Sequence, residues 1–173
     1  MPDSGQNQDK KNSHWAEDSG FERTIFEPEH EMFRDSVRRF IAEEITPYYA
    51  DWEEAGETPR EVWLKAGAAG MLGTSIPEAY GGVEGGFLYD AVVLEELGRA
   101  GAAAPAFDLH SYIVAPFLQK FGTEEQKQRW LPGMASGEII ASIGMTEPDS
   151  GSDLTWMRPP MRCARSRMMA SPT

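Results

Sequence analysis

Apolar residues recur at steps of three and four along the first part of the chain, and this spacing is typical of one face of an α-helix. The residues that set the pattern are Phe33, Val37, Phe40, Ile41 and Ile45. They predict a long first helix from Glu29, with Pro28 in its first turn. Because proline lacks an N–H donor, Pro47 is expected to interrupt or bend this helix before the apolar stripe ends near Gly56.

Two more helices are predicted in the middle of the chain. Thr58 followed by Pro59 resembles an N-cap with proline in the first helical position, which would open a short second helix that Gly70 ends. A third helix begins at Phe87 and runs to about Leu97. It is apolar on most sides, which is typical of a helix buried among other helices.

A fourth and a fifth helix complete the helical pattern. The fourth spans residues 109–121, with a bend near Pro116 and a stop at the glycine that follows. Thr123 and Gln126 have the spacing of a capping box, in which each side chain satisfies a backbone N–H near the other. They predict the start of a fifth helix that runs through Trp130.

Two segments lack helical spacing. Residues 73–86 contain Pro77 and several glycines, too many breakers for regular structure, so they predict a packed loop. Residues 139–143 form a short apolar, β-branched run bounded by turn residues, which predicts a buried strand. The expected fold class is therefore all-α, an amino-terminal bundle of about five helices followed by a short β-strand and an irregular tail.

The pattern divides the chain into four parts. Residues 1–23 are expected to form a flexible polar arm, 24–137 the helical domain, 138–155 a strand with its turn, and 156–173 an irregular basic tail. From residue 157 the tail contains several arginines and prolines and no acidic residue. It is interpreted either as a flexible basic tail or as a frame-shifted or misjoined end, and the second interpretation is favoured.

Composition narrows the class of partner. A net charge of −12 and a pI near 4.7 argue against nucleic acid, because phosphate binding draws on clustered Lys and Arg. Cys163 has no second cysteine to pair with, and no apolar run approaches the roughly 18 residues that a membrane span needs. The start of the chain is polar and acidic rather than Arg-rich, so a reducing, cytoplasmic location is expected.

The segment after the predicted strand combines hydroxyls, glycines and a proline. Its residues are Ile143, Gly144, Met145, Thr146, Glu147, Pro148, Asp149, Ser150, Gly151 and Ser152. The two glycines permit close approach of the backbone to a planar ring or a phosphate, and the hydroxyl groups offer hydrogen bonds. Taken alone, the composition of the segment favours an ordinary polar loop after a strand.

Several motifs follow one another in the order found in a single enzyme family. They are residues 25–38, 63–73, 76–82, 95–97, 121–127, 130–132 and 145–153. Together these motifs resemble the amino-terminal helical domain of the flavin-dependent acyl-CoA dehydrogenases, and look closest to the long-chain type. The resemblance runs from about Thr24 to Leu154, less than half of a family enzyme, and Trp156 stands where the family pattern has a glycine.

The resemblance implies a function and its participants. It implies FAD as cofactor, an acyl-CoA substrate oxidised to trans-2-enoyl-CoA, an electron-transfer flavoprotein as acceptor and a homo-oligomer when the enzyme is complete. It assigns Ile143 to Ser152 to the flavin, with Thr146 at the ring and Ser152 also near the substrate. The family's catalytic glutamate lies on a later helical bundle, so no catalytic residue is nominated here and the chain is expected to be a truncated, inactive fragment.

Three questions stay open from the residues alone. Glu95 and Glu96 are interpreted as pocket-floor residues or as a solvated helix face, the latter being favoured for at least one. The small residues 101–105 indicate either room for a long acyl tail or a closely packed helix end. No metal-ligand spacing is found, His30 and His110 included. The alternative function is a non-catalytic helical binding or subunit-docking module.

Overall fold

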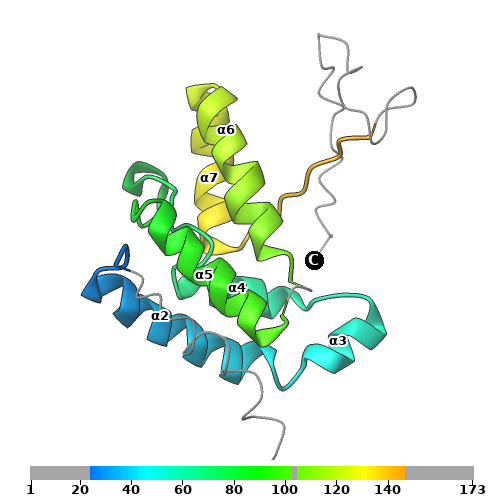
Figure 1. Cartoon of the computed structure of the whole chain (residues 1–173). Helices are drawn as coiled ribbons and strands as arrows, with labels where there is room; N and C mark the ends of the chain where they lie inside the picture. The colour runs from blue at the N-terminus through cyan, green and yellow to red at the C-terminus, as the bar shows by residue number, and fades with distance from the viewer. Residues whose placement is uncertain (1–23, 103–104, 147–173) are drawn as a thin grey trace, which may run out of the picture.

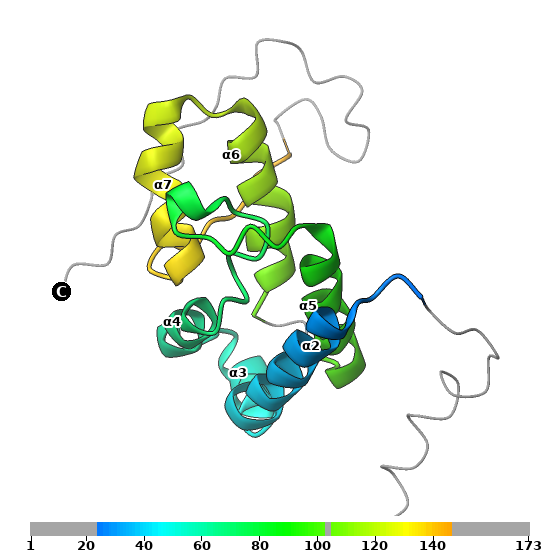
Figure 2. The ribbon, with the colours of Figure 1, turned by 90° about the vertical axis from the view of Figure 1, so that its left-hand side faces the viewer.

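The computed structural model describes residues 24–102 and 105–146, and these form a pack of helices (Figure 1). The α-helices are α2 (Pro28–Phe40), α3 (Tyr49–Ala55), α4 (Arg60–Ala68), α5 (Phe87–Ala100), α6 (Ala115–Phe121) and α7 (Glu124–Ser136). Both ribbon views place α6 and α7 together above the group formed by α2, α3, α4 and α5 (Figure 2). No strand occurs within the described residues, so the prediction of an all-α fold is confirmed.

The first predicted helix is interrupted, and its apolar stripe is divided between α2 and α3. Pro28 is the first residue of α2, as expected, and the His30 ring accepts a hydrogen bond from the Glu27 N–H at 3.0 Å. The helix continues as a π-helical stretch, Ile41–Ile45, and ends before Pro47. The chain then turns into the separate helix α3, so the interruption predicted at the proline is confirmed.

The start of α4 corrects one prediction. Pro59 is the N-cap, not the first helical residue, and the helix begins at Arg60. The reason is the backbone of Pro59, whose ψ of 143° is extended and not helical. At the other end Gly70 has a φ of +73° and donates to the Gly67 carbonyl at 2.9 Å, which confirms it as the stop.

Helix α5 is less enclosed than its sequence indicates. Val92, Val93 and Leu97 are buried, and α5 lies against α2 over much of its length. Phe87 at its first turn is nevertheless 75 % exposed, and Leu94 also reaches the surface. The prediction of a helix covered on most sides was therefore wrong for one face, because no described element packs there.

The last two helices confirm their predicted signals. A π-helical stretch, Leu109–Val114, precedes α6, so the fourth predicted helix is not a regular α-helix throughout. At the start of α7 the Gln126 N–H donates to the Thr123 hydroxyl at 3.3 Å, while the Thr123 N–H donates to the Gln126 side chain at 2.9 Å. This is the predicted capping box. The helix then runs on through Pro132.

The glycine-rich segment between α4 and α5 is a packed loop, as predicted, except for a short 3₁₀ helix, Glu78–Tyr80, that the prediction missed. The Val83 N–H donates to the Gly73 carbonyl at 2.9 Å, and the Gly85 N–H donates to the Thr74 carbonyl at 2.8 Å. A side chain at Gly82 would meet the Ile76 carbonyl oxygen at 2.0 Å, so glycine is required for this close approach.

Two groups of buried apolar side chains hold these elements together. The first lies among α2, α4 and α5 and includes Val37, Ile41, Trp63, Leu72 and Val92. The second lies under α6 and α7 and consists of Ile76, Ala115, Leu131, Met134 and Ala135. Removing apolar surface from water is the main favourable contribution to folding, so these two groups fix the positions of the helices.

The strand predicted at residues 139–143 is not formed. The described chain leaves α7 and runs past α6 without regular secondary structure up to residue 146 (Figure 1). A strand is defined by its ladder of hydrogen bonds to a neighbour, and no described segment supplies one. The predicted arm at 1–23 and the tail at 156–173 lie outside the described residues.

Candidate functional site

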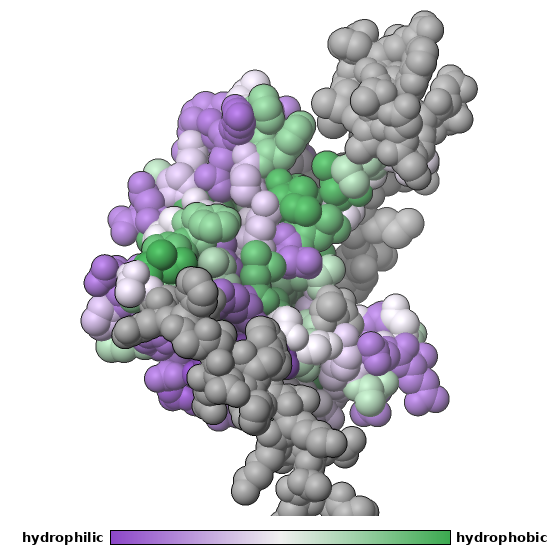
Figure 3. All heavy atoms as spheres, viewed as in Figure 1, coloured by the Kyte–Doolittle hydropathy of each residue, from purple (hydrophilic) through white to green (hydrophobic). Residues whose placement is uncertain are grey.

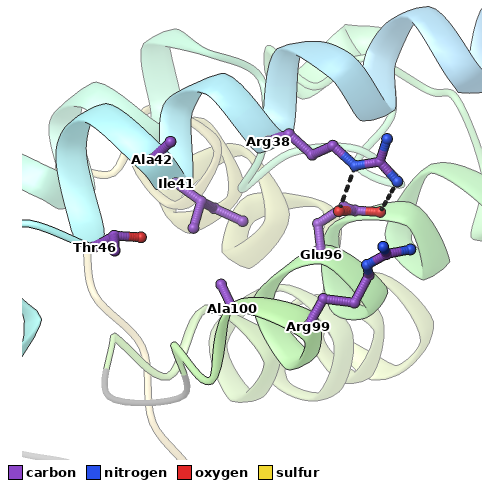
Figure 4. Close-up of a pocket in the computed structure, with 7 residues that line it drawn as sticks. All are labelled: Arg38, Ile41, Ala42, Thr46, Glu96, Arg99 and Ala100. Atoms are coloured by element: carbon purple, nitrogen blue, oxygen red, sulfur yellow. Dashed lines mark hydrogen bonds and ion pairs between the residues drawn. The ribbon is translucent and has the colours of Figure 1, made fainter. Parts of the chain in front are cut away.

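A cluster of ion pairs joins α2 to α5. The Arg34 side chain, 3 % exposed, donates to a Glu96 oxygen at 2.9 Å and to a Glu95 oxygen at 2.8 Å. Arg38 donates to both oxygens of the Glu96 carboxylate, at 2.8 and 3.1 Å (Figure 4). Two guanidinium groups thus hold one buried carboxylate in a charge-assisted network.

This pairing decides the role of the two glutamates. Burial opposes ionisation of Glu96, yet the hydrogen bonds from Arg38 and Arg34 outweigh it and hold the pKa of its carboxyl below the usual value. A carboxylate held in this way is a poor proton acceptor, so Glu96 stabilises the helix pair. Glu95 is 32 % exposed at its side chain and is the more solvated of the two, in line with the favoured interpretation.

Two surface hollows lie beside α5. One, of about 240 Å³, is lined by Glu96 itself together with Arg38, Ile41, Ala42, Thr46, Arg99 and Ala100 (Figure 4). The other, of about 250 Å³, is lined by Leu94, Leu97, Gly98, Gly101, Ala102, Phe107 and Asp108. The second hollow has a mainly apolar wall and includes two of the small residues singled out in the sequence.

The C-terminal end of α7 is built against α4 at very short range. Gly137 ends the helix with a φ of +78°, and a side chain there would meet the Trp63 carbonyl oxygen at 2.2 Å. A side chain at Gly67 would likewise meet the Ser136 carbonyl oxygen at 2.2 Å. Only glycine permits both contacts, so these two positions fix where the chain leaves the helical domain.

Three hydrogen bonds then guide the chain beyond α7. The Ile139 N–H donates to the Gly133 carbonyl at 2.8 Å, and the Arg60 side chain donates to the Glu138 carbonyl. The Ala141 N–H donates to Nδ1 of the buried His110 ring at 3.0 Å. Elements from three parts of the sequence therefore hold residues 138–141, just before the predicted flavin segment.

The predicted cofactor residues are described only in part. Ile143 is half-buried, whereas Gly144, Met145 and Thr146 are exposed. A side chain at Gly144 would meet nothing within 4 Å, so the backbone there is open on one side. The other predicted residues lie outside the described part of the chain: Glu147, Pro148, Asp149, Ser150, Gly151 and Ser152.

The sequence did not predict the side chains that hold residues 138–141, the segment that we call the exit from α7. His110 and Arg60 carry no motif, and their partners are backbone groups far away in the sequence. The only available signal was a histidine inside an apolar helical stretch, which is more often a core residue than a ligand. The arginine pair on α2 did have a signal, since Arg34 and Arg38 are one turn apart and share a helix face.

Residues 24–102 and 105–146 contain neither a metal-binding cluster nor a membrane span. No group of three or more His, Cys, Asp or Glu side chains there lies in a position to hold a metal ion. No helix in this part of the chain is both long and apolar enough to cross a bilayer.

Apolar side chains also gather on the outside of the molecule, over and beside α6 (Figure 3). Ile113, Phe117 and Phe121 follow one another at one-turn spacing and are exposed, and the rings of Phe117 and Phe121 lie 4.9 Å apart. Ile140 and Met145 are exposed as well. We call Ile113, Phe117 and Phe121 the α6 stripe.

Comparison with known proteins places this helical pack in a family. The model of the acyl-CoA dehydrogenase N-terminal domain matches residues 27–138. The long-chain specific acyl-CoA dehydrogenase of Rattus norvegicus mitochondria is 48 % identical over 136 residues, which are 79 % of this chain and 32 % of that protein. The chain thus spans about a third of the length of this relative.

Solved structures agree with the sequence match. The acyl-CoA dehydrogenase from Geobacillus kaustophilus superimposes with a TM-score of 0.73 at 44 % identity, covering 77 % of this chain and 35 % of that one. An acyl-CoA dehydrogenase from Bacillus anthracis, complexed with FAD, gives a TM-score of 0.67 at 33 % identity, covering 78 % and 23 %. The chain therefore belongs to the acyl-CoA dehydrogenase family, and residues 27–138 form the N-terminal domain of that family.

Proposed function

We propose that this chain carries the amino-terminal part of an FAD-dependent acyl-CoA dehydrogenase, an oxidoreductase of fatty acid oxidation. The single observation that supports this most is that a family-matched helical pack holds residues 138–141 in place, immediately before the segment that resembles the family's flavin signature. The substrate is a fatty acyl-CoA and the product a trans-2-enoyl-CoA.

The described part of the predicted flavin segment is compatible with a flat, anionic cofactor. Gly144 leaves its backbone open, and Thr146 presents an exposed hydroxyl. Backbone N–H groups and hydroxyls in such a turn suit the polar edge of a ring or a phosphate. Ile143, Gly144, Met145 and Thr146 would hold FAD together with residues 147–152, and Ser152 would also approach the CoA portion of the substrate.

The chemistry removes two hydrogens from neighbouring carbons. A carboxylate base takes the proton from the α carbon, while the β hydrogen leaves as a hydride. FAD, when bound, supplies the hydride acceptor, and an electron-transfer flavoprotein is the proposed next acceptor. Glu96 is paired with two arginines and is a poor proton acceptor, so we do not propose it as this base. We propose that these 173 residues do not turn over acyl-CoA by themselves, because the family resemblance implies a catalytic glutamate on a later helical bundle.

The apolar hollow at the end of α5 is the place we propose for the far end of the acyl chain. Its wall includes Gly101, which has no side chain, and Ala102, whose side chain is a single methyl group, together with Leu97. Chain-length profiling of an intact relative that carries this segment tests the proposal. Preference for long acyl chains is expected, and preference for short ones contradicts the assignment of the hollow.

A chimaera tests the proposed function directly. Residues 24–146 of this chain replace the matching part of the Geobacillus kaustophilus enzyme, and bound flavin and acyl-CoA-dependent flavin bleaching are measured. Both are expected to survive the exchange. Thr146→Val in the chimaera should lower flavin affinity, whereas Ser142→Ala, an exposed position before the predicted segment, serves as the matched control. Equal affinity in the two variants contradicts the assignment of Thr146.

The second candidate function is a non-catalytic docking module, and the exposed α6 stripe favours it. An apolar stripe of this kind on a soluble protein marks a surface that associates. We expect the isolated chain to associate, and Phe117→Ser with Phe121→Ser to reduce this in sedimentation experiments. A monomeric chain with stoichiometric FAD contradicts the docking module.

Homo-oligomerisation of the complete enzyme and a cytoplasmic location remain predictions, and the rat relative is mitochondrial.

A further inference from the structure

One buried histidine has contacts that the family function does not use. His110 lies in the π-helical stretch before α6, and none of its surface is exposed. Its Nε2 is 3.1 Å from the Met134 carbonyl oxygen in the last turns of α7. Its Nδ1 is 3.0 Å from the Ala141 N–H in the segment that leaves α7. One ring thus joins three separate stretches of the chain.

The two contacts fix the position of the ring proton. A backbone N–H is always a donor, so the Ala141 contact requires Nδ1 to be the acceptor. The proton of the neutral ring is therefore on Nε2, which donates to the Met134 carbonyl. Burial lowers the pKa of His110, although the hydrogen bond to the Met134 carbonyl works in the other direction. A second proton on Nδ1 would face the Ala141 N–H and break this contact.

Neighbouring rings keep the imidazole in this orientation. Trp63 of α4 packs edge-on against His110 with ring centroids 5.2 Å apart, and Phe107 packs edge-on against the same indole at 4.8 Å. Aromatic rings in such edge-to-face contacts resist rotation within a close-packed core. Nδ1 of His110 is therefore held in a fixed direction, toward the Ala141 N–H.

The bonded amide stands close to the predicted flavin segment. Within residues 24–102 and 105–146 the Ala141 N–H makes the hydrogen bond nearest to Ile143. An extended chain rises about 3.3 Å per residue, so Thr146 lies up to about 16 Å further on. A small rotation at Ala141 would displace Thr146 by several ångströms in this geometry, and misplacement of about 1 Å is enough to impair a reacting site.

We propose that His110 is a positioning residue, whose Nδ1 holds the Ala141 amide and thereby sets the direction in which the chain enters the flavin segment. The identity of the cofactor in this proposal rests on the proposed function, whereas the hydrogen bond between His110 and the Ala141 amide does not depend on it. The ring is fully buried, so it acts through the backbone of Ala141.

Two amide variants of the full chain test the proposal. His110→Asn places an oxygen near the Nδ1 position, so it keeps the acceptor for Ala141 and loses the donor toward Met134. His110→Gln reaches the Nε2 position, so it keeps the donor toward Met134 and leaves the Ala141 amide without an acceptor. The two substitutions are equally polar and separate the two nitrogen atoms, and circular dichroism verifies that both variants fold.

Hydrogen–deuterium exchange of individual amides is the first measurement. We expect the Ala141 amide to exchange about tenfold faster in the Gln variant than in the unsubstituted chain, and to stay within about threefold in the Asn variant. Amides of α2 and α5 should not change in either. Equal exchange at Ala141 in the two variants, or faster exchange spread evenly over α2 and α5, would overturn the proposal.

FAD binding by equilibrium dialysis is the second measurement, and it separates this proposal from the proposed function. Weaker binding in the Gln variant and unchanged binding in the Asn variant supports the positioning role. Equal binding in all three proteins, despite altered exchange at Ala141, overturns that role. If the unsubstituted chain retains no FAD, the flavin function of this chain fails, and exchange at residues 143–146 still decides whether His110 orders the segment.

Discussion

The interface between α2 and α5 and the exit from α7 both bury polar groups, but they satisfy them in different ways. At the interface, charged side chains pair with one another, and Glu96 has both oxygens bonded by arginines. At the exit, the buried His110 ring accepts from the Ala141 N–H, while the exposed Arg60 side chain donates to the Glu138 carbonyl. The first arrangement closes on itself and stabilises two helices, whereas the second controls the path of the chain. Burial of polar groups alone thus does not reveal which role a site has.

The largest effect is expected from breaking the interface. Glu96→Ala leaves Arg34 buried without its main partner, and removing one member of a buried pair costs about 3 kcal/mol. The part due to Arg38 is smaller, because this side chain is well exposed to solvent. Urea unfolding measures the loss of stability. Glu95→Gln, at the more exposed carboxylate, is the control, and an equal loss in both variants would contradict a buried role specific to Glu96.

A smaller but still clear effect is expected at the exit. Gly137→Ala places a methyl group against the Trp63 carbonyl oxygen at a residue with positive φ, which costs about 2 kcal/mol. Gly144→Ala, where the added atom meets nothing within 4 Å, should leave the thermal midpoint unchanged. If both glycines tolerate alanine equally, the close contact between α4 and α7 does not constrain the exit.

The two regions should also differ in their response to pH. The pKa of His110 is lowered in the folded chain, so the unfolded chain takes up its proton first, and stability falls as the pH drops below about 6.5. This slope is at most about 1.4 kcal/mol per pH unit, and it should vanish in His110→Asn. Glu96, with its lowered pKa, contributes stability that is lost only at more acidic pH, below about 4.3.

One buried carboxylate has a raised pKa, so its effect on the pH dependence of stability is opposite in sign to the effects of His110 and Glu96 and has to be separated from them. Burial raises the pKa of Asp90, although hydrogen bonds from Thr74 and Ser75 work against it. The folded chain therefore loses stability as the pH rises from the ordinary aspartate pKa through the raised one. Unfolding curves of the unsubstituted chain and of His110→Asn, measured between pH 4 and 8, isolate the histidine contribution by difference. Identical slopes in the two proteins above pH 5 would contradict a neutral, buried His110.

The smallest effect is expected away from both regions, at the start of α7. Thr123→Ala removes the hydroxyl that accepts from the Gln126 N–H, and loss of such a cap costs about 1 kcal/mol. Ser36→Ala, on the exposed face of α2, is the control and should stay within about 0.5 kcal/mol of the unsubstituted chain. A loss as large as that of Gly137→Ala would show that α7 depends on its cap as much as on its contact with α4.

Local signals in the sequence predicted most of the helical pack. Proline at the start of α2, the capping box at Thr123 and the stop at Gly70 act through nearby backbone groups, so each is visible in a few residues. The residue at which α4 begins was wrong by one position, because the extended backbone of Pro59 decides it. The strand at residues 139–143 was also wrong, because a strand needs a partner that short-range patterns do not supply.

The candidate site was predictable only in part. The motif order predicted the family and named Ile143 to Thr146 and the residues after them as the flavin segment, and the family membership is confirmed. The assignment of those residues to a flavin stays a prediction. The supporting residues His110 and Arg60 were not predicted, because each bonds to a backbone group dozens of positions away.

The amino-acid sequence by itself determined the helices, their caps and the family, because these depend on residue type and spacing along the chain. Only the tertiary structure decided that Glu96 is a paired, buried carboxylate and that His110 holds the Ala141 amide. Such roles depend on which distant groups folding brings within hydrogen-bond distance. A side chain that has lost water must find its partner there, and that partner is not written next to it in the sequence.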